Sequence, residues 1–500
     1  MDGFQISGLL YLVATAFFIL GIKRLSKVRT AQSGNQLAAI GMLLAVVVTL
    51  VSPEGGIALD PEGGIALDPE GGIALDWTTV VLGLVLGGGV GLFMAKRVEM
   101  TGMPELVALL NGFGGLASTV VALAEFWGRY AAADGLIGSP GSITAEPLGG
   151  AVWAVAIIMS VLIGTVTFTG SLLAMAKLSG KVSGNPIILP ARHLITGVLL
   201  LGGCAAGFYG MFGAEGDMAT TLLLTLCLAA GLFGITSVLP IGGADMPVVV
   251  SLLNSYSGLA ASMAGFVIGN SLLIVAGALV GASGLILTMV MCKAMNRSLG
   301  NVLIGGFGDS GASSGGGGGA DEYTTVKSAG AEEAAMILES ATSVIFIPGY
   351  GMAVAQAQHV VKELGEEMEK RGATVKYGIH PVAGRMPGHM NVLLAEADVP
   401  YEQLLELEKI NGDFKTTDVT VIIGANDVVN PEAIENPQSP IAGMPILNAH
   451  ESGTVLMVKR SLSPGYAGIK NPLFERENTY MCFGDGKAFL VDVLAELKES

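Results

Sequence analysis

The chain has 500 residues, of which 51% are hydrophobic and 14% are charged, and its formal net charge is −16. Soluble globular proteins carry about 25% charged residues, so this composition excludes an ordinary soluble protein. The strong acidity argues against nucleic acid as a partner. Almost all of the acidic excess lies in residues 301–500, which hold 14 Lys and Arg against 27 Asp and Glu.

Apolar stretches long enough to cross a bilayer as helices predict nine transmembrane helices in the first 300 residues. They lie at about 4–21, 36–52, 77–95, 103–128, 149–176, 194–213, 218–238, 246–268 and 270–292. Basic residues such as Lys23, Arg97 and Lys177 follow the odd-numbered stretches. Because such residues favour the cytoplasmic side, we expect the N-terminus outside and the C-terminal region in the cytoplasm.

A perfect repeat separates the second and third stretches: the octapeptide Pro53–Asp60 recurs at 61–68 and 69–76. Units this short and rich in Gly and Pro cannot bury a core, which favours a tandem duplication in a tolerant loop. A calcium-binding repeat is the alternative. The chain's four cysteines show no metal-ligand spacing, so we expect no metal site.

Two of the apolar stretches share a motif, because residues 103–117 align with residues 246–260. Each copy begins Met-Pro and carries an asparagine eight residues later, Asn111 and Asn254, about 12 Å along a helix that rises 1.5 Å per residue. Amides at this depth normally face the interior of a helix bundle. We expect them to line a proton or ion path, and the alternative is that each only bonds to a neighbouring helix.

Two charges flank the eighth and ninth stretches on the predicted cytoplasmic side, Asp245 and Arg297. We assign them to the same path and expect them to pair where the C-terminal domain docks. The alternative is that both are ordinary solvated loop charges.

A Gly-rich segment, residues 301–330, divides the sequence and contains five consecutive glycines. This composition predicts a flexible linker between a transmembrane domain, 1–300, and a second domain, 331–500. The second domain is predicted to have strands at 342–348, 374–379, 418–423, 443–448, 453–458 and 478–483, and helices near 351–371, 402–411 and 486–498. Such alternation predicts a Rossmann-like α/β domain with a doubly wound parallel sheet.

A dinucleotide fingerprint opens this domain, with Gly349 and Gly351 between a strand-like run and a helix. Such a turn presents backbone N–H groups to a pyrophosphate. The third glycine of the pattern is replaced by Val354. The residues predicted to contact the cofactor here are Gly349, Tyr350, Gly351, Met352, Ala353 and Val354.

The residues at the ends of later strands favour NADP(H) over NAD(H). The strand 375–380 lacks the acidic residue that holds an NAD ribose, whereas Lys459 and Arg460 follow the strand 453–458 and would bind a 2′-phosphate. A solvated strand end is the alternative for this pair.

Two further loops are predicted at the same edge. Arg385 would reach a phosphate from the loop 380–389, whose two histidines we expect to be structural rather than metal ligands. Asn426 and Asp427 follow the strand 418–423, and Asp427 is the candidate catalytic residue, which would accept a hydrogen bond from a nicotinamide or take up a proton. Capping of a turn is the alternative role for this carboxylate.

Together these motifs resemble the beta subunit of proton-translocating NAD(P) transhydrogenase over nearly the whole length. The resemblance implies a Re/Si-specific enzyme, active only with an alpha partner subunit, that transfers hydride from NADH to NADP+ coupled to inward proton translocation. NADP(H) would bind this chain and NAD(H) the partner, which also supplies extra membrane helices. A homodimer of the heteromeric unit in a bacterial-type inner membrane is expected. The resemblance also implies that Gly465 and Tyr466 belong to a loop that covers the nucleotide.

One position departs from the family pattern, because many relatives carry a proton-carrying His where this chain has Asn111. Asn cannot titrate at physiological pH, so the titrating group is expected from a helix of the partner subunit, while Asn111 orients water. The alternative function is a membrane transporter or channel gated by a cytoplasmic NADP(H)-sensing domain.

Overall fold

A computed structural model of the chain shows two compact units, Met1–Gly243 with Val249–Thr288, and Ala244–Val248 with Met289–Ser500. The structure describes residues 3–25, 28–51, 77–98, 102–132, 150–184, 186–214, 216–243, 245–295, 298–304, 323–385, 388–465 and 467–499. The octapeptide repeats, Arg297 and Tyr466 lie outside these residues.

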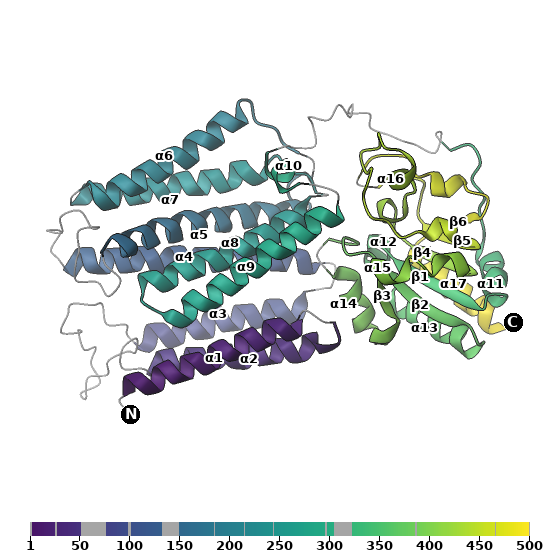
Figure 1. Cartoon of the computed structure of the whole chain (residues 1–500), viewed down its shortest axis with the longest axis horizontal. Helices are drawn as coiled ribbons and strands as arrows, with labels where there is room; N and C mark the ends of the chain where they lie inside the picture. Colours follow the sequence, from purple (N-terminus) through teal and green to yellow (C-terminus); the bar gives the residue numbers. More distant parts are fainter. Residues whose placement is uncertain are drawn as a thin grey trace. The chain divides into compact units, whose positions relative to one another are not determined.

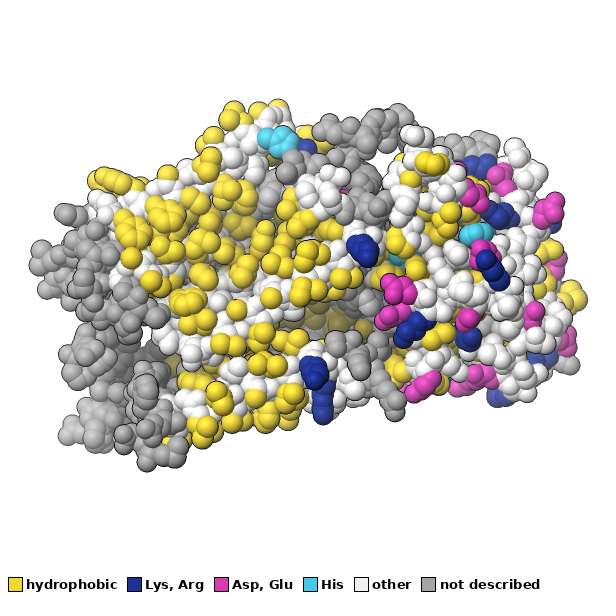
Figure 2. All heavy atoms as spheres, in the orientation of Figure 1, with side chains coloured by type: hydrophobic (Ala, Val, Ile, Leu, Met, Phe, Trp, Pro, Cys, Tyr) yellow, Lys and Arg dark blue, Asp and Glu magenta, His cyan; other side chains and the backbone are white. Residues whose placement is uncertain are grey.

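The first unit is built of long apolar helices, and the described residues include nine that are long and apolar enough to cross a membrane. They are α1 (Gly3–Leu25), α2 (Val28–Val51), α3 (Trp77–Arg97), α4 (Met103–Ala132), α5 (Gly150–Leu178), α6 (Arg192–Phe212), α7 (Asp217–Val238), α8 (Met246–Val267) and α9 (Ser271–Ala294) (Figure 1). Figure 2 shows that hydrophobic side chains cover these helices, whereas charged side chains gather on the second unit. The predicted polytopic bundle is therefore confirmed.

Helix α5 is the centre of the best-packed part of the bundle, where it lies against α4, α6 and α7. Phe126 of α4, Trp153 and Ile157 of α5 and Leu226 of α7 are buried together. Gly164 of α5 brings two backbones into contact, because a methyl group there would lie 2.5 Å from the carbonyl oxygen of Gly115 on α4. Small residues that let helices approach closely are the usual means of association in lipid, where no hydrophobic force favours helix pairing.

The second unit contains a six-stranded, wholly parallel sheet in the order β3-β2-β1-β4-β5-β6. Its strands are β1 (Ser343–Pro348), β2 (Thr374–Ile379), β3 (Leu404–Glu406), β4 (Val419–Ile423), β5 (Thr454–Lys459) and β6 (Thr479–Phe483). Its helices are α10 (Leu299–Ile304), α11 (Ala331–Glu339), α12 (Tyr350–Ala355), α13 (Gln358–Lys370), α14 (His389–Glu396), α15 (Leu407–Ile410), α16 (Glu432–Glu435) and α17 (Gly486–Glu499). This topology confirms the doubly wound α/β prediction.

Three predicted elements differ from the structure. Residues 443–448 are not a strand, although Ile446 and Leu447 are buried, because Pro445 cannot donate to a sheet ladder. The helix predicted at 402–411 is interrupted by the edge strand β3, which separates the short 3-10 helix η4 (Tyr401–Gln403) from α15. The helix predicted at 351–371 is broken into α12 and α13 at Gln356, which has a left-handed backbone (φ 52°).

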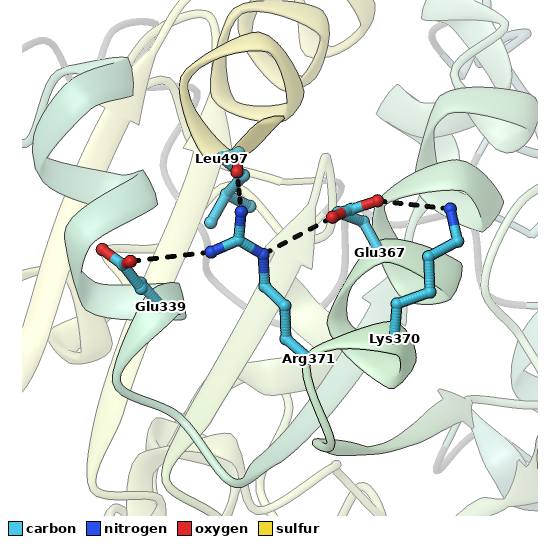
Figure 3. A network of polar contacts seen from close by, with 5 residues as sticks. All are labelled: Glu339, Glu367, Lys370, Arg371 and Leu497. Atoms are coloured by element: carbon cyan, nitrogen blue, oxygen red, sulfur yellow. Dashed lines mark hydrogen bonds and ion pairs between the residues drawn. The ribbon is translucent and has the colours of Figure 1, made fainter. Parts of the chain in front are cut away.

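Arg371, at the end of α13, ties three helices together on one side of the sheet (Figure 3). Its guanidinium lies 3.6 Å from Glu339 of α11 and 3.5 Å from Glu367 of α13, and donates to the carbonyl oxygen of Leu497 in α17. Lys370 pairs with the same Glu367 at 3.3 Å. The contact with Leu497 satisfies a carbonyl at a helix C-terminus, where cations are favoured.

Candidate functional site

The fingerprint turn joins β1 to α12 and is interlocked with the turn that follows β4. Gly349 N donates to Ile423 O at 2.8 Å, and Gly351 N donates to Gly424 O at 2.9 Å. A methyl group on Gly351 would lie 2.6 Å from the Cα of Gly424, whose own φ is +63°. Glycine is therefore required on both sides, so that two backbones can touch where neighbouring strands β1 and β4 end.

The interlock also uses the N–H groups of the fingerprint glycines. Those of Gly349 and Gly351 are bonded to main-chain oxygens, and the contact of these glycines with a pyrophosphate stays a prediction. On α12, Met352 and Ala353 are fully buried in the unit, whereas Val354 is 41% exposed. The chain runs from β1 outward to β2 and β3 and then crosses back to β4 on the other side of β1. The end of β1 is therefore the switch point, where open α/β sheets bind ligands.

The residues at the ends of β4 and β5 form a second part of this edge. Asp427, the first residue of η6 (Asp427–Val429), accepts a hydrogen bond on Oδ2 from Ala467 N at 2.9 Å. With its amide oxygen turned toward the same loop, Asn426 accepts from Gly465 N (2.8 Å) and Lys459 Nζ (3.0 Å). A methyl group on Gly465 would lie 2.6 Å from the Asp427 carboxylate. The structure thus brings together four of the predicted residues, and the loop of residues 459–467 is held against Asn426 and Asp427.

Lys459 and Arg460 differ in their surroundings. The Lys459 amine lies 4.9 Å from the centre of the Phe474 ring and donates to Ser463 O. Burial lowers the pKa of Lys459 to about 8, an effect that the Asp427 carboxylate partly opposes. The Lys459 amine is thus fixed at the start of the loop of residues 459–467, whereas Arg460 is exposed.

The third part of the edge is the loop of residues 380–389, which is anchored by a buried histidine at each end. His380 Nε2 bonds to Pro445 O at 2.8 Å, and its Nδ1 accepts from Val382 N at 3.3 Å. His389 Nδ1 accepts from Arg385 N at 3.1 Å. Burial lowers the pKa of both imidazoles, to about 4 for His380, so both are neutral at physiological pH.

Arg385 is oriented by an aromatic ring from the fingerprint turn. Its guanidinium lies 4.6 Å from the centre of the Tyr350 ring, a cation–π contact that holds the side chain in place. Tyr350 and Arg385, far apart in the sequence, therefore lie side by side. Among the described residues, no cluster of three His, Cys, Asp or Glu side chains could hold a metal ion.

In the membrane unit, Asn111 faces the interior of the bundle. It is 7% exposed, and its Nδ2 donates to the main-chain oxygen of Val250 on α8 at 3.2 Å. Asn254 lies one turn further along α8 and is half-buried. Asp245, at the start of α8, is 3% exposed. The pairing of Asp245 with Arg297 falls outside the described residues.

Ser171 of α5, close to Asn111, is a candidate residue of the predicted path that the sequence did not indicate. It is fully buried, and a methyl group on Gly112, next to Asn111, would lie 3.2 Å from its Cβ. Within the described part of the chain its hydroxyl has no hydrogen-bond partner. A lone serine in an apolar stretch gave no signal, because serine is common in membrane helices as a packing residue.

The fold and these two sites define a polytopic membrane protein that carries a dinucleotide-binding type of α/β unit. Residues 7–496 match the family described as NAD(P) transhydrogenase beta subunit. Two relatives from Rhodospirillum rubrum, both named NAD(P) transhydrogenase subunit beta, are 46% identical to the chain over 478 residues, covering 95% of this chain and 96% of each relative. The chain belongs to the NAD(P) transhydrogenase beta-subunit family, which confirms the resemblance seen in the sequence.

Proposed function

We propose that the chain is the NADP(H)-binding and proton-conducting subunit of a Re/Si-specific transhydrogenase, which moves hydride from NADH to NADP+ while protons move inward across the membrane. Family membership supports this proposal over the whole length of the chain. The observation that carries it is the convergence of Lys459, Arg385 and Asp427 on the switch-point edge of the sheet.

The residues present at this edge fit NADP(H) better than NAD(H). The strand β2 ends in Ile379 and His380, so the carboxylate that would hold an unphosphorylated ribose is missing. Lys459 and Arg460 would hold the 2′-phosphate, and Arg385 would bind a further phosphate oxygen. Each of these cations lies at the carboxyl end of a strand or in the loop that follows it.

The nicotinamide cofactors supply the hydride chemistry, and this chain supplies binding, orientation and exclusion of water. The loop of residues 459–467, with Gly465 and Tyr466, would cover the nucleotide. Asp427 holds this loop through Ala467 N. A proton taken up at Oδ2 of Asp427 would weaken this bond, since a protonated oxygen is a poorer acceptor, and would link loop position to proton uptake.

We propose that Asn111, Asn254, Asp245 and Arg297 line the proton path. Neither amide titrates near neutral pH. Asn111 would therefore orient water or a neighbouring group, and a helix of the alpha subunit would supply the proton carrier. We propose domain limits at 1–300, 301–330 and 331–500, with the N-terminus outside, in a bacterial-type inner membrane and as a homodimer of the heteromeric unit.

The binding test uses the full chain alone in membrane vesicles, because the alpha subunit would bind NADH at a site of its own. NADPH should bind far more tightly than NADH, and Lys459→Ala should raise the NADPH Kd roughly ten- to hundredfold, since a charged hydrogen bond is worth about 1.5–3 kcal/mol. Lys498→Ala on the exposed side of α17 is the matched control and should change neither affinity.

Sealed vesicles that hold the chain assembled with its alpha subunit test coupling. Hydride transfer from NADH to NADP+ should change the internal pH, and turnover without any pH change would contradict the proposal. If NADPH altered proton flux without being consumed, the chain would instead be a transporter gated by an NADP(H)-sensing unit.

A further inference from the structure

The first described residues after the Gly-rich segment form a strap, residues 323–329, along the edge of the sheet. Ser328 pairs with Met481 of β6 in a parallel bridge. Met481 N donates to Lys327 O at 2.8 Å, and Ala329 N donates to Met481 O at 3.1 Å. The strap is therefore held at residues 327–329 by main-chain hydrogen bonds to β6, the last strand of the sheet.

The near end of the strap is bound to residues 471–475, which follow the loop of residues 459–467. The Tyr323 hydroxyl accepts from Asn471 N at 3.0 Å, and the Tyr323 ring lies 5.5 Å from that of Phe474. Thr324 N donates to Glu475 Oε1 at 2.8 Å. Hydrogen bonds from Lys470 and then from Thr324 N lower the pKa of Glu475, which keeps this carboxylate charged.

Asn471 connects the strap to the nucleotide site. It is fully buried, and its Oδ1 accepts from Leu473 N at 3.0 Å, which fixes the start of η8 (Pro472–Glu475). Its Nδ2 donates to the main-chain oxygen of Asn426 at 3.2 Å. Asn426 in turn accepts from Lys459 Nζ. A chain of three hydrogen bonds thus runs from Tyr323 through Asn471 and Asn426 to the amine of Lys459.

We propose that Tyr323 is a positioning residue for the 2′-phosphate, and that the docked strap sets the place of the Lys459 amine. This inference rests on the proposed role of Lys459 in holding that phosphate. Selectivity for the phosphorylated nucleotide is the property that depends on the strap.

Tyr323→Phe is the sharpest test, because it removes one acceptor oxygen and keeps the ring against Phe474. The full chain, without the alpha subunit that would bind NADH at its own site, is titrated with NADPH and with NADH. A lost hydrogen bond of about 1 kcal/mol corresponds to a roughly fivefold rise in Kd. We expect this rise for NADPH, while the Kd for NADH, which has no 2′-phosphate, stays within about twofold of the wild-type value.

A second variant and a control make the result decisive. Glu475→Gln loosens the hold on Thr324 and should lower the preference for NADPH in the same direction. Tyr401→Phe on the exposed η4 (Tyr401–Gln403) makes the same chemical change away from the strap and should alter neither Kd.

The outcomes separate this inference from the proposed function. If wild type prefers NADPH and both strap variants keep that preference unchanged, the strap proposal is overturned alone. An equal rise in both Kd values would also overturn it, because that pattern reports general loosening of the unit. A wild type that bound both nucleotides equally would overturn the proposed function, and the strap proposal with it.

Discussion

Mild acid should destabilise the α/β unit through His380. This imidazole is 2% exposed, and its Nδ1 accepts the Val382 N–H, so a proton at Nδ1 would face another N–H group. Burial lowers the pKa of His380 from 6.5 to about 4, and the bond to Pro445 O only partly opposes this. Such a depression corresponds to roughly 3 kcal/mol.

The direction follows from proton binding. Between pH 6.5 and pH 4 the unfolded chain binds a proton on this histidine and the folded chain does not. The free energy of unfolding therefore falls as the pH falls through this window. Above the window, the contribution of His380 to stability is fully present. At pH 5 the loss from His380 alone is about 2 kcal/mol. His389, whose pKa is lowered by burial and by Arg385, changes stability in the same direction.

The assay is urea unfolding of the full chain in nanodiscs at pH 7.5 and pH 5. Pulse proteolysis within residues 331–500 is the readout of unfolding. His380→Gln keeps a donor for Pro445 O but cannot titrate, so the difference in unfolding free energy between the two pH values should shrink by about 2 kcal/mol. His359→Gln, on the exposed face of α13, should behave as wild type. An unchanged pH dependence in His380→Gln would refute the reasoning.

Two further predictions concern packing in the same unit. Gly424→Ala places a side chain at φ +63° and against the backbone of Gly351. We expect a loss of at least about 1–2 kcal/mol of stability and weaker NADPH binding. A variant as stable as wild type in pulse proteolysis would contradict the interlock of the two turns. Arg371→Ala removes the link from α13 to α11 and α17. Because the ion pairs of Arg371 are partly exposed, we expect the free energy of unfolding to fall by only about 1 kcal/mol. Hydrogen exchange at the end of α17 should become faster, and nucleotide affinity should not change. Arg371→Ala exchange rates equal to those of wild type would show that the carbonyl of Leu497 does not need this partner.

The parts of the fold that sequence predicted are those with strong periodic signals. Each of the nine long apolar runs corresponds to a helix in the part of the chain that the structure describes, and buried strands followed by amphipathic helices form the parallel sheet. The errors fall where the signal was local and weak. The edge strand β3 has only three residues, which are half-buried or exposed, so no apolar run marked it. Gln356 breaks a helical pattern, although glutamine is not a residue type that favours a left-handed backbone.

The site shows a similar division. Motif spacing placed the fingerprint turn, Lys459 and Asp427 at one edge of a sheet, because parallel strands end on the same side. It did not reveal how the groups there are used, since the bonds from Gly349 and Gly351 depend on the pairing of β1 with β4. The role of Asn471 was equally hidden, because its three connections come from a strap and a turn far away in the sequence.

The electrostatics of Lys459 explain why the groups at this edge would act together. Burial favours the neutral amine, and the Asp427 carboxylate restores part of the preference for the charged form. A proton on Asp427 would remove that support and would also weaken its bond to Ala467 N. One protonation would therefore change both the charge that we propose holds a 2′-phosphate and the loop around it. By linkage, a bound phosphate that favours the charged amine would equally change the affinity of Asp427 for its proton.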